Sequence, residues 1–149
     1  MKFRSLSSVP VVMLLALAPI GAQAVEETPK AIPGGVCVSA EQAKAQFDKG
    51  TLFIDARVAA EYAEKHIKGA KNIPFKEAYT KESKTSTVDS FDASKLPVDK
   101  TKPVVFYCNG SPCWKGYKAA AAAIKLGYKQ VYWFRDGAPG WAAKGYPTE

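Results

Sequence analysis

Residues 103–127 read PVVFYCNGSPCWKGYKAAAAAIKLG, and this stretch indicates the fold more strongly than any other part of the chain. Pro103–Tyr107 is an apolar run rich in β-branched and aromatic residues, which predicts a buried strand. Trp114–Leu126 is alanine-rich and is closed by Gly127, which predicts a helix. Between them, two cysteines five positions apart enclose a loop. The stretch therefore predicts a strand, a loop and a helix in direct succession.

The rest of the chain repeats this alternation of short apolar runs and helical segments. Ser39 and Gln42 form a capping-box pattern that opens a helix ending near Lys49-Gly50. The other predicted strands are 36–38, 51–56, 71–74 and 130–134, and the other predicted helices are 58–65 and a short one at Trp141. Residues 75–102 are polar and predict mostly surface loop. Such alternation predicts an α/β domain with a central, mostly parallel sheet and helices on both faces.

The first 24 residues have the pattern of a secretory signal peptide. Lys2 and Arg4 precede an apolar run at 9–20, and Ala22-Gln23-Ala24 forms a small-residue cleavage site. The apolar run is shorter than the roughly 20 residues of a membrane span. We therefore expect a signal peptide at 1–24, a flexible polar lead-in with little to bury at 25–35, and a domain at 36–149. The mature protein is expected in the periplasm or secreted, without membrane attachment.

The charge of the chain does not suggest a nucleic-acid ligand. The net charge is +7, and it falls to +5 once Lys2 and Arg4 are removed with the leader. The remaining excess is scattered lysine, and only Arg57 and Arg135 remain as arginines, whereas nucleic-acid binders cluster their basic residues. We expect a monomer with a solvated basic surface that weakly attracts small anions.

The cysteine loop lies where ligand sites of parallel α/β sheets lie, at the carboxyl end of a strand and the amino end of a helix. Successive backbone N–H groups and the helix terminus favour an anion there. Gly110 can take a positive φ, so the loop can curl. A cysteine at its mouth would be stabilised as the nucleophilic thiolate.

Four segments in this order resemble a rhodanese-type sulfurtransferase domain: TLFIDAR at 51–57, EYAEKHIKGAKNIP at 61–74, VVFYCNGSPCWKGYKAAAAAIKLGY at 104–128, and VYWFRDGAPGWAAKGYP at 131–147. The resemblance spans about 37–147 and implies the rhodanese-like fold. It implies that Cys108 accepts a sulfane sulfur from a small anionic donor such as thiosulfate and passes it, as a persulfide, to a thiol or cyanide. The resemblance is also consistent with a partner protein that donates the sulfur.

The resemblance implies a substrate-binding loop and no cofactor. The loop comprises Asn109, Gly110, Ser111, Pro112, Cys113 and Trp114. It lacks the basic residue that many family members carry there, so Lys115 and Lys118 in the following helical turns are the candidates for charge support. A related phosphatase would carry an arginine at the position of Trp114, and none is nearby. Bidentate phosphate recognition needs arginine, so the sequence argues against a phosphatase.

Cys113 leaves three interpretations open. It can be a passive loop residue, a resolving thiol that forms a disulfide with Cys108, or half of a structural bridge in an oxidising compartment. A functional Cys108 is favoured over a structural bridge, because so short a loop gives little entropic stabilisation. We favour a passive Cys113, with its side chain turned away from Cys108, since a bridge would collapse the anion cradle. A thiol–disulfide protein and a non-catalytic binding module are the alternatives to sulfur transfer.

The remaining polar candidates are expected to be structural. Asp55 and Arg57 close a strand and predict a buried or half-buried ion pair. His66 falls where the family has a histidine before a turn, and a hydrogen-bonding role is expected. Cys37, between two valines, is expected to be a small buried hydrophobic residue. The spacing of cysteines and histidine predicts no metal site.

Overall fold

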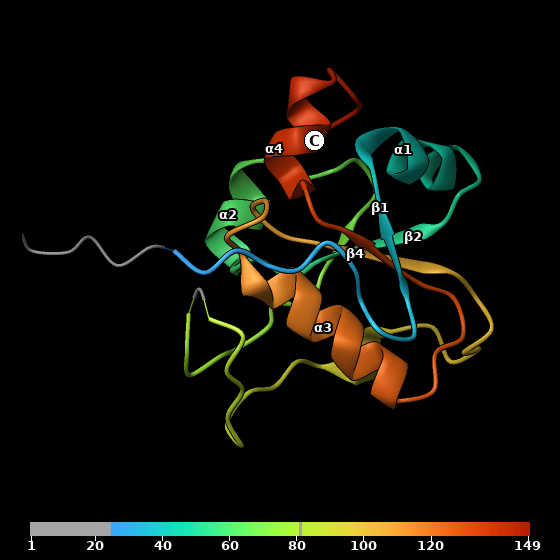
Figure 1. The fold of residues 1–149 in the computed structure, drawn as a ribbon. Helices are drawn as coiled ribbons and strands as arrows, with labels where there is room; N and C mark the ends of the chain where they lie inside the picture. The colour runs from blue at the N-terminus through green and yellow to red at the C-terminus, as the bar shows by residue number, and fades with distance from the viewer. Residues whose placement is uncertain (1–24, 81) are drawn as a thin grey trace, which may run out of the picture.

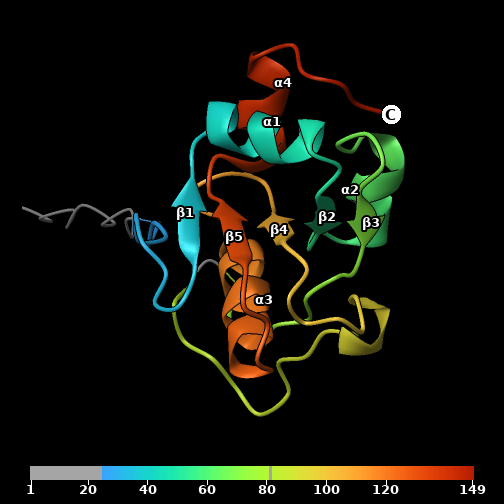
Figure 2. The same cartoon turned by 90° about the vertical axis from the view of Figure 1, so that its right-hand side faces the viewer.

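The structure is a computed structural model that describes residues 25–80 and 82–149, and Figure 1 shows the path of the chain. The predicted signal peptide at 1–24 lies outside the described residues. A sheet of five strands in the order β1-β5-β4-β2-β3 forms the centre, and every pair of neighbours is parallel (Figure 2). The strands are β1 (Val36–Val38), β2 (Leu52–Asp55), β3 (Lys71–Asn72), β4 (Val104–Tyr107) and β5 (Val131–Phe134).

Helices cover both faces of this sheet, which confirms the predicted fold class. The helix α3 (Trp114–Lys125) lies on the opposite side of the sheet from α1 (Ala40–Asp48) and α4 (Gly137–Ala143) (Figure 1). Alanines of α3 pack with Phe106 and Trp133 in one core, whereas Ala43 of α1 and Trp141 of α4 pack with Phe53 in the other. The short α2 (Ala59–Glu64) buries none of its residues. No helix among the described residues is long and apolar enough to cross a membrane.

The strand β4 is central and fully buried, as expected for the PVVFY run. Its four residues pair with β2 on one side and β5 on the other. A parallel strand buried on both faces needs apolar residues at every position, which is why the run does not alternate. Because β4 is the middle strand, the loop that follows it emerges at the centre of the sheet edge.

One stretch differs from the sequence-based prediction. The last helix begins at Gly137, ahead of the predicted start at Trp141. Pro139 is tolerated because it lies in the first turn, where a backbone N–H has no intrahelical partner. The described residues of the region 75–102 are mostly loop, as predicted, with one short 3-10 helix at Ala93–Lys95.

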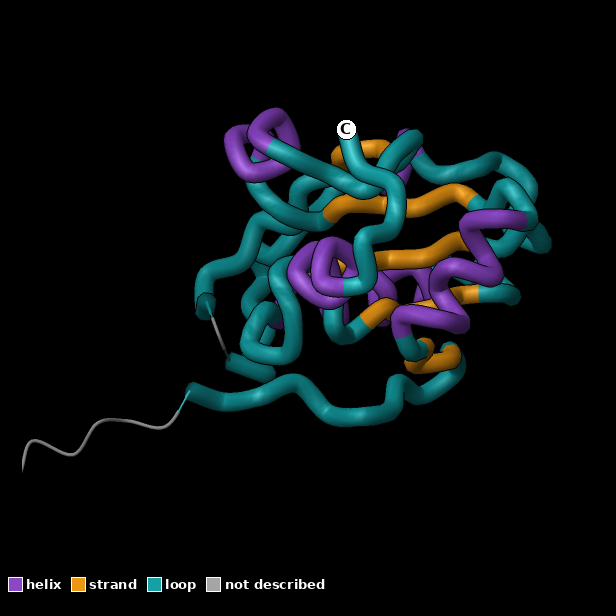
Figure 3. Tube along the Cα trace, turned by 90° about the horizontal axis from the view of Figure 1, so that it is seen from above, coloured by secondary structure: helices purple, strands orange, loops and turns teal. Residues whose placement is uncertain are grey.

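The lead-in at 25–35 is packed on the domain, so the expectation that it has little to bury was wrong. Thr28 is only 2% exposed and Ile32 only 4%. In Figure 3, the loop that follows the grey trace runs along one side of the domain before it enters β1. This segment contacts the cysteine loop through Thr28.

Candidate functional site

The loop 108–113 joins the carboxyl end of β4 to the amino end of α3, as predicted. Cys108 directly follows β4, and Cys113 is the N-cap residue of α3. The burial of β4 leaves Cys108 only 3% exposed, whereas Cys113 is half-buried. The two cysteines therefore lie at different depths in one loop.

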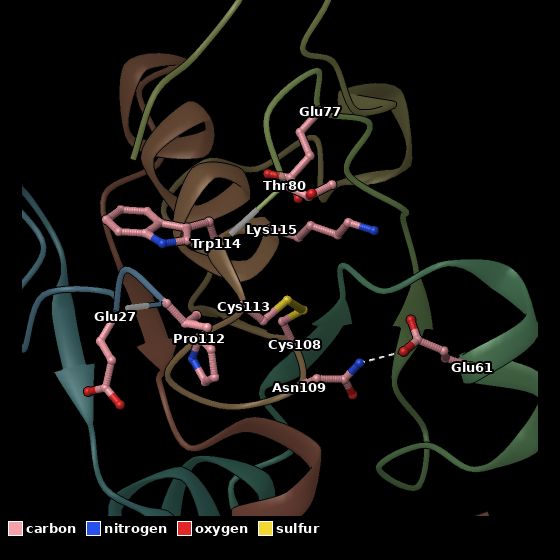
Figure 4. A pocket seen from close by; sticks show the side chains of 11 residues that line it. Glu27, Glu61, Glu77, Thr80, Cys108, Asn109, Pro112, Cys113, Trp114 and Lys115 are labelled. Carbon is pink, nitrogen blue, oxygen red and sulfur yellow. Dashed lines mark hydrogen bonds between the residues drawn. A yellow bond between two sulfur atoms is a disulfide. The ribbon is translucent and has the colours of Figure 1, made fainter. Parts of the chain in front are cut away.

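Cys108 and Cys113 form a disulfide, with their α-carbons 6.1 Å apart (Figure 4). This separation lies within the range that a bridge requires. The expectation that the Cys113 side chain turns away from Cys108 was therefore wrong. The loop is short, and its curvature directs both side chains to the same side.

The curvature of the loop depends on Gly110. This residue has φ +95°, and the N–H of Cys113 donates to its carbonyl at 3.0 Å, which closes a tight turn. A positive φ is readily accessible only to glycine. In the described part of the chain, the N–H groups of Asn109, Gly110 and Ser111 donate to no backbone carbonyl. These groups remain available as donors for an anion, as a cradle requires.

The start of α4 contacts the first residue of the loop. The N–H of Ala138 donates to the carbonyl of Cys108 at 2.8 Å. On the other side, Gly116 of α3 packs against Cys108, since a Cβ there would lie 3.3 Å from the Cys108 Cβ. The absence of side chains at Gly116 and Gly137 lets two helices approach the backbone of one cysteine.

Asp55 and Arg57 form the predicted ion pair, and the structure connects it to the loop. Arg57 Nη2 lies 2.6 Å from Asp55 Oδ2, and both side chains are buried. Arg57 Nη1 donates to the side-chain oxygen of Asn109 at 3.3 Å, and the Asn109 amide donates to Glu61 at 2.5 Å (Figure 4). The Asp55 hydrogen bond raises the pKa of Arg57 against the opposing effect of burial. The residue after Cys108 is thus fixed to a permanently charged group.

His66 has the expected hydrogen-bonding role and lies away from the cysteines. Its Nδ1 is 2.8 Å from the carbonyl of Tyr62, and its ring stacks on the Tyr62 ring. Its backbone pairs with that of Glu149, whose carboxylate lies 3.4 Å from Nε2. His66 therefore ties the turn after α2 to the last residue of the chain.

The two lysines proposed for charge support differ in position. Lys115 lines the cavity in front of the cysteines, and within the described residues it forms no ion pair (Figure 4). Lys118 is buried, and its Nζ bonds Glu77 at 2.8 Å and the carbonyl of Tyr79 at 3.0 Å. The charge of Lys118 is therefore paired with Glu77, which itself lines the cavity, and charge support of the site by Lys118 stays a prediction. The sequence alone could not show that the 76–80 segment returns to cover it.

Residues 26–28, here called the N-terminal strap, contact the loop on both sides of Cys113. The carbonyl of Ser111 accepts from the N–H of Thr28 at 2.9 Å and from its hydroxyl at 2.7 Å. The indole of Trp114 donates to the carbonyl of Glu26 at 2.9 Å. Arg135 secures the strap through the carbonyl of Thr28 at 2.8 Å and the carboxylate of Glu27 at 3.1 Å. Sequence reasoning missed these contacts, because they join residues more than 80 positions apart.

A cavity of about 570 Å³ opens in front of the disulfide (Figure 4). Two of its three carboxylates are paired, Glu27 with Arg135 and Glu77 with Lys118. Glu61 and Lys115 remain as opposite charges, so the cavity is close to neutral. It is lined by Val25, Glu27, Glu61, Glu77, Thr80, Cys108, Asn109, Pro112, Cys113, Trp114 and Lys115.

The third cysteine lies outside this cavity. Cys37 is in β1, opposite Trp133 of β5, and is half-buried rather than buried. Burial raises the pKa of its thiol, which keeps it protonated at neutral pH. Among the described residues, no group of three or more His, Cys, Asp or Glu side chains is placed to hold a metal ion.

One comparison with known proteins identifies a family. The protein-family model of the Rhodanese-like domain matches residues 39–144. A search of the curated proteins found no match.

Among solved structures, the BH2092 protein from Bacillus halodurans is 24% identical, with a TM-score of 0.57 over 77% of each chain. The polysulfide-sulfur transferase homodimer from Wolinella succinogenes is 19% identical, with a TM-score of 0.57 over 80% of this chain and 81% of that one. Thiosulfate sulfurtransferase from Pseudomonas aeruginosa is 22% identical, with a TM-score of 0.54 over 77% of this chain but only 20% of that longer one. At these identities the likeness concerns the fold.

Proposed function

Because the chain belongs to the rhodanese-like domain family, we propose that it is a sulfurtransferase that carries a sulfane sulfur as a persulfide on Cys108. One observation carries this proposal: Cys108 lies at the base of a loop that offers unpaired N–H groups at the amino end of α3. A persulfide is anionic and is easily lost to other thiols. A sheltered position with several hydrogen-bond donors is the environment that it requires.

The reaction begins from the reduced protein. The thiolate of Cys108 attacks the sulfane sulfur of a donor such as thiosulfate, whose S–S bond breaks and releases sulfite. The thiolate of an acceptor, or cyanide, then attacks the outer sulfur of the persulfide. This step returns Cys108 as a thiolate, so that one sulfur atom is transferred without net oxidation of the protein.

The loop stabilises the charge of both the thiolate and the persulfide. Hydrogen bonds to charged groups contribute about 1.5–3 kcal/mol each, so two or three N–H donors can lower the pKa of a thiol substantially. Lys115 adds a positive charge at the cavity, opposite Glu61. Because the cavity is nearly neutral, we expect only modest electrostatic selection for an anionic donor. We therefore propose sulfane-sulfur donors as a class, with thiosulfate as one member.

We also propose that the protein is exported. The signal-peptide pattern at 1–24 supports this location, and the disulfide is compatible with it, since such bonds persist in oxidising compartments. Amino-terminal sequencing of the mature protein should begin at Val25. An intact Met1 on the mature protein would contradict export.

The transfer reaction tests the proposed function. Reduced protein is incubated with thiosulfate and cyanide, and thiocyanate is measured over time. Wild type and Cys37→Ser should form thiocyanate at similar rates, while Cys108→Ser should form none, because a serine hydroxyl cannot become a persulfide. Equal activity of Cys108→Ser and wild type would exclude Cys108 as the carrier.

A further inference from the structure

We infer that Cys113 is a resolving thiol that displaces hydrosulfide from the Cys108 persulfide, so that the protein has a second activity, dithiol-dependent sulfide release. This inference rests on the proposed function, because it needs a sulfur-loaded Cys108. It assigns Cys113 a chemical role that simple sulfur transfer does not require. Cys113 is suited to this role by its position, its electrostatic environment and its accessibility.

The loop backbone already places the two sulfur atoms within bonding distance. The α-carbons are 6.1 Å apart with the bridge closed, and the turn from Gly110 to Cys113 fixes this arrangement. Hydrogen bonds hold both ends of the loop, to Ala138 at Cys108 and to Thr28 at Ser111. An intramolecular attack in such a preorganised loop is strongly favoured over attack by a thiol from solution.

The environment of Cys113 favours its thiolate, the attacking form. Cys113 is the N-cap of a 12-residue helix, and its side chain caps no backbone N–H. The positive end of the helix dipole lies there and stabilises a negative charge within the first turn. Lys115, in that turn, lines the same cavity and adds a second positive charge, which Glu61 in the cavity partly offsets. Cys113 is therefore well placed to attack the persulfide.

The displacement is balanced in atoms and electrons. The thiolate of Cys113 attacks Sγ of the Cys108 persulfide, the bond between Sγ and the outer sulfur breaks, and the outer sulfur takes a proton from water and leaves as hydrosulfide. The sulfane sulfur gains two electrons, and the two cysteines together lose two as they form the disulfide. The closed loop seen here is the product of this step.

An external dithiol must then reopen the bridge. Its first thiolate attacks Cys113, because Cys113 is half-buried whereas Cys108 is 3% exposed. Cys108 is also the better leaving group, since its thiolate returns to the N–H donors of the loop. The second thiol of the dithiol resolves the mixed disulfide and frees Cys113. The closed form cannot accept sulfur, so each turnover of this activity requires reduction.

The experiment uses single turnovers in a Cys37→Ser background, which removes the third thiol. Reduced protein is separated from reductant, mixed with thiosulfate, and followed by intact mass and by sulfide release. We expect the protein with both loop cysteines to release stoichiometric sulfide and to end as the disulfide. Cys113→Ser and Cys113→Ala should retain the added sulfur and release no sulfide, with a persulfide lifetime at least tenfold longer.

The outcomes separate the two proposals. A stable persulfide on the protein with both loop cysteines, as long-lived as in the Cys113 variants, would overturn the resolving role and leave sulfur transfer intact. Failure of the Cys113 variants to gain sulfur, with folding confirmed by circular dichroism, would overturn both proposals.

Discussion

Gly137 approaches Cys108 so closely that no side chain fits between them. A Cβ on Gly137 would lie 2.1 Å from the carbonyl oxygen of Cys108 and 2.8 Å from the N–H nitrogen of Gly110. Gly137 also has φ +58°, and the next residue, Ala138, donates to that same carbonyl at 2.8 Å. The amino end of α4 thus fixes the position of Cys108 through contacts that only glycine permits.

Gly137→Ala should therefore destabilise the protein and slow sulfur loading. A non-glycine residue at positive φ costs about 1–2 kcal/mol, and the clash with Cys108 adds to this cost. Gly145→Ala is the matched control, because Gly145 has φ +68° but nothing within 4 Å of its Cβ position. Thermal unfolding should show a clearly larger loss for Gly137→Ala. Equal losses of stability in the two variants would show that the protein accommodates the added methyl group next to Cys108 without a free-energy cost.

Arg57→Ala should be strongly destabilising, because it leaves the carboxylate of Asp55 buried at 0% exposure without its counter-ion. Removing one partner of a buried ion pair typically costs about 3–5 kcal/mol. Lys44→Ala breaks the exposed Lys44–Asp48 pair and should cost less than about 1 kcal/mol. Urea denaturation of both variants measures the difference. Similar midpoints would contradict the structural importance of Asp55 and Arg57.

Thr28→Val tests the N-terminal strap while preserving side-chain shape. It removes the hydroxyl bond to Ser111 and keeps the backbone bond, so we expect a loss of about 0.5–1.5 kcal/mol and faster amide exchange in the strap. Thr101→Val, which removes an exposed bond to Asp99, is the control. Unchanged exchange at residues 26–28 would show that the hydroxyl does not hold the strap.

Cys37 should be the least reactive thiol of the reduced protein. Burial raises its pKa, so its thiolate fraction is small at neutral pH and grows as the pH increases. Alkylation with iodoacetamide at pH 7, followed by peptide mass spectrometry, should modify Cys113 well before Cys37. The rate at Cys37 should increase toward pH 9. Faster labelling of Cys37 at pH 7 would contradict this order.

The sheet was predictable because its signals are local. The apolar run at 104–107, the capping box at Ser39 and the glycine after α3 each specify their own element. The position of Cys108 follows from these elements, since the loop after a central parallel strand lies at the sheet edge. The pair Asp55–Arg57 was predictable for the same reason, as both residues belong to one short segment.

The contacts of the loop with distant segments could not be predicted. Nothing in the sequence near Lys118 indicates Glu77, and nothing near Ser111 indicates Thr28, which is 83 residues away. The sequence allowed a bridge between Cys108 and Cys113 without requiring it. Its formation depends on how tightly the loop curls at Gly110. Such features arise from tertiary packing, for which one sequence gives no periodic signal.

The central claim, that Cys108 carries the transferred sulfur, is tested most directly by locating that sulfur. Reduced Cys113→Ser and Cys108→Ser proteins are incubated with thiosulfate, and their peptides are mapped by mass spectrometry under non-reducing conditions. We predict an added sulfur atom on the Cys108 peptide of Cys113→Ser and none on any peptide of Cys108→Ser. An added sulfur on Cys113 in the Cys108→Ser protein, at a comparable yield, would contradict this account.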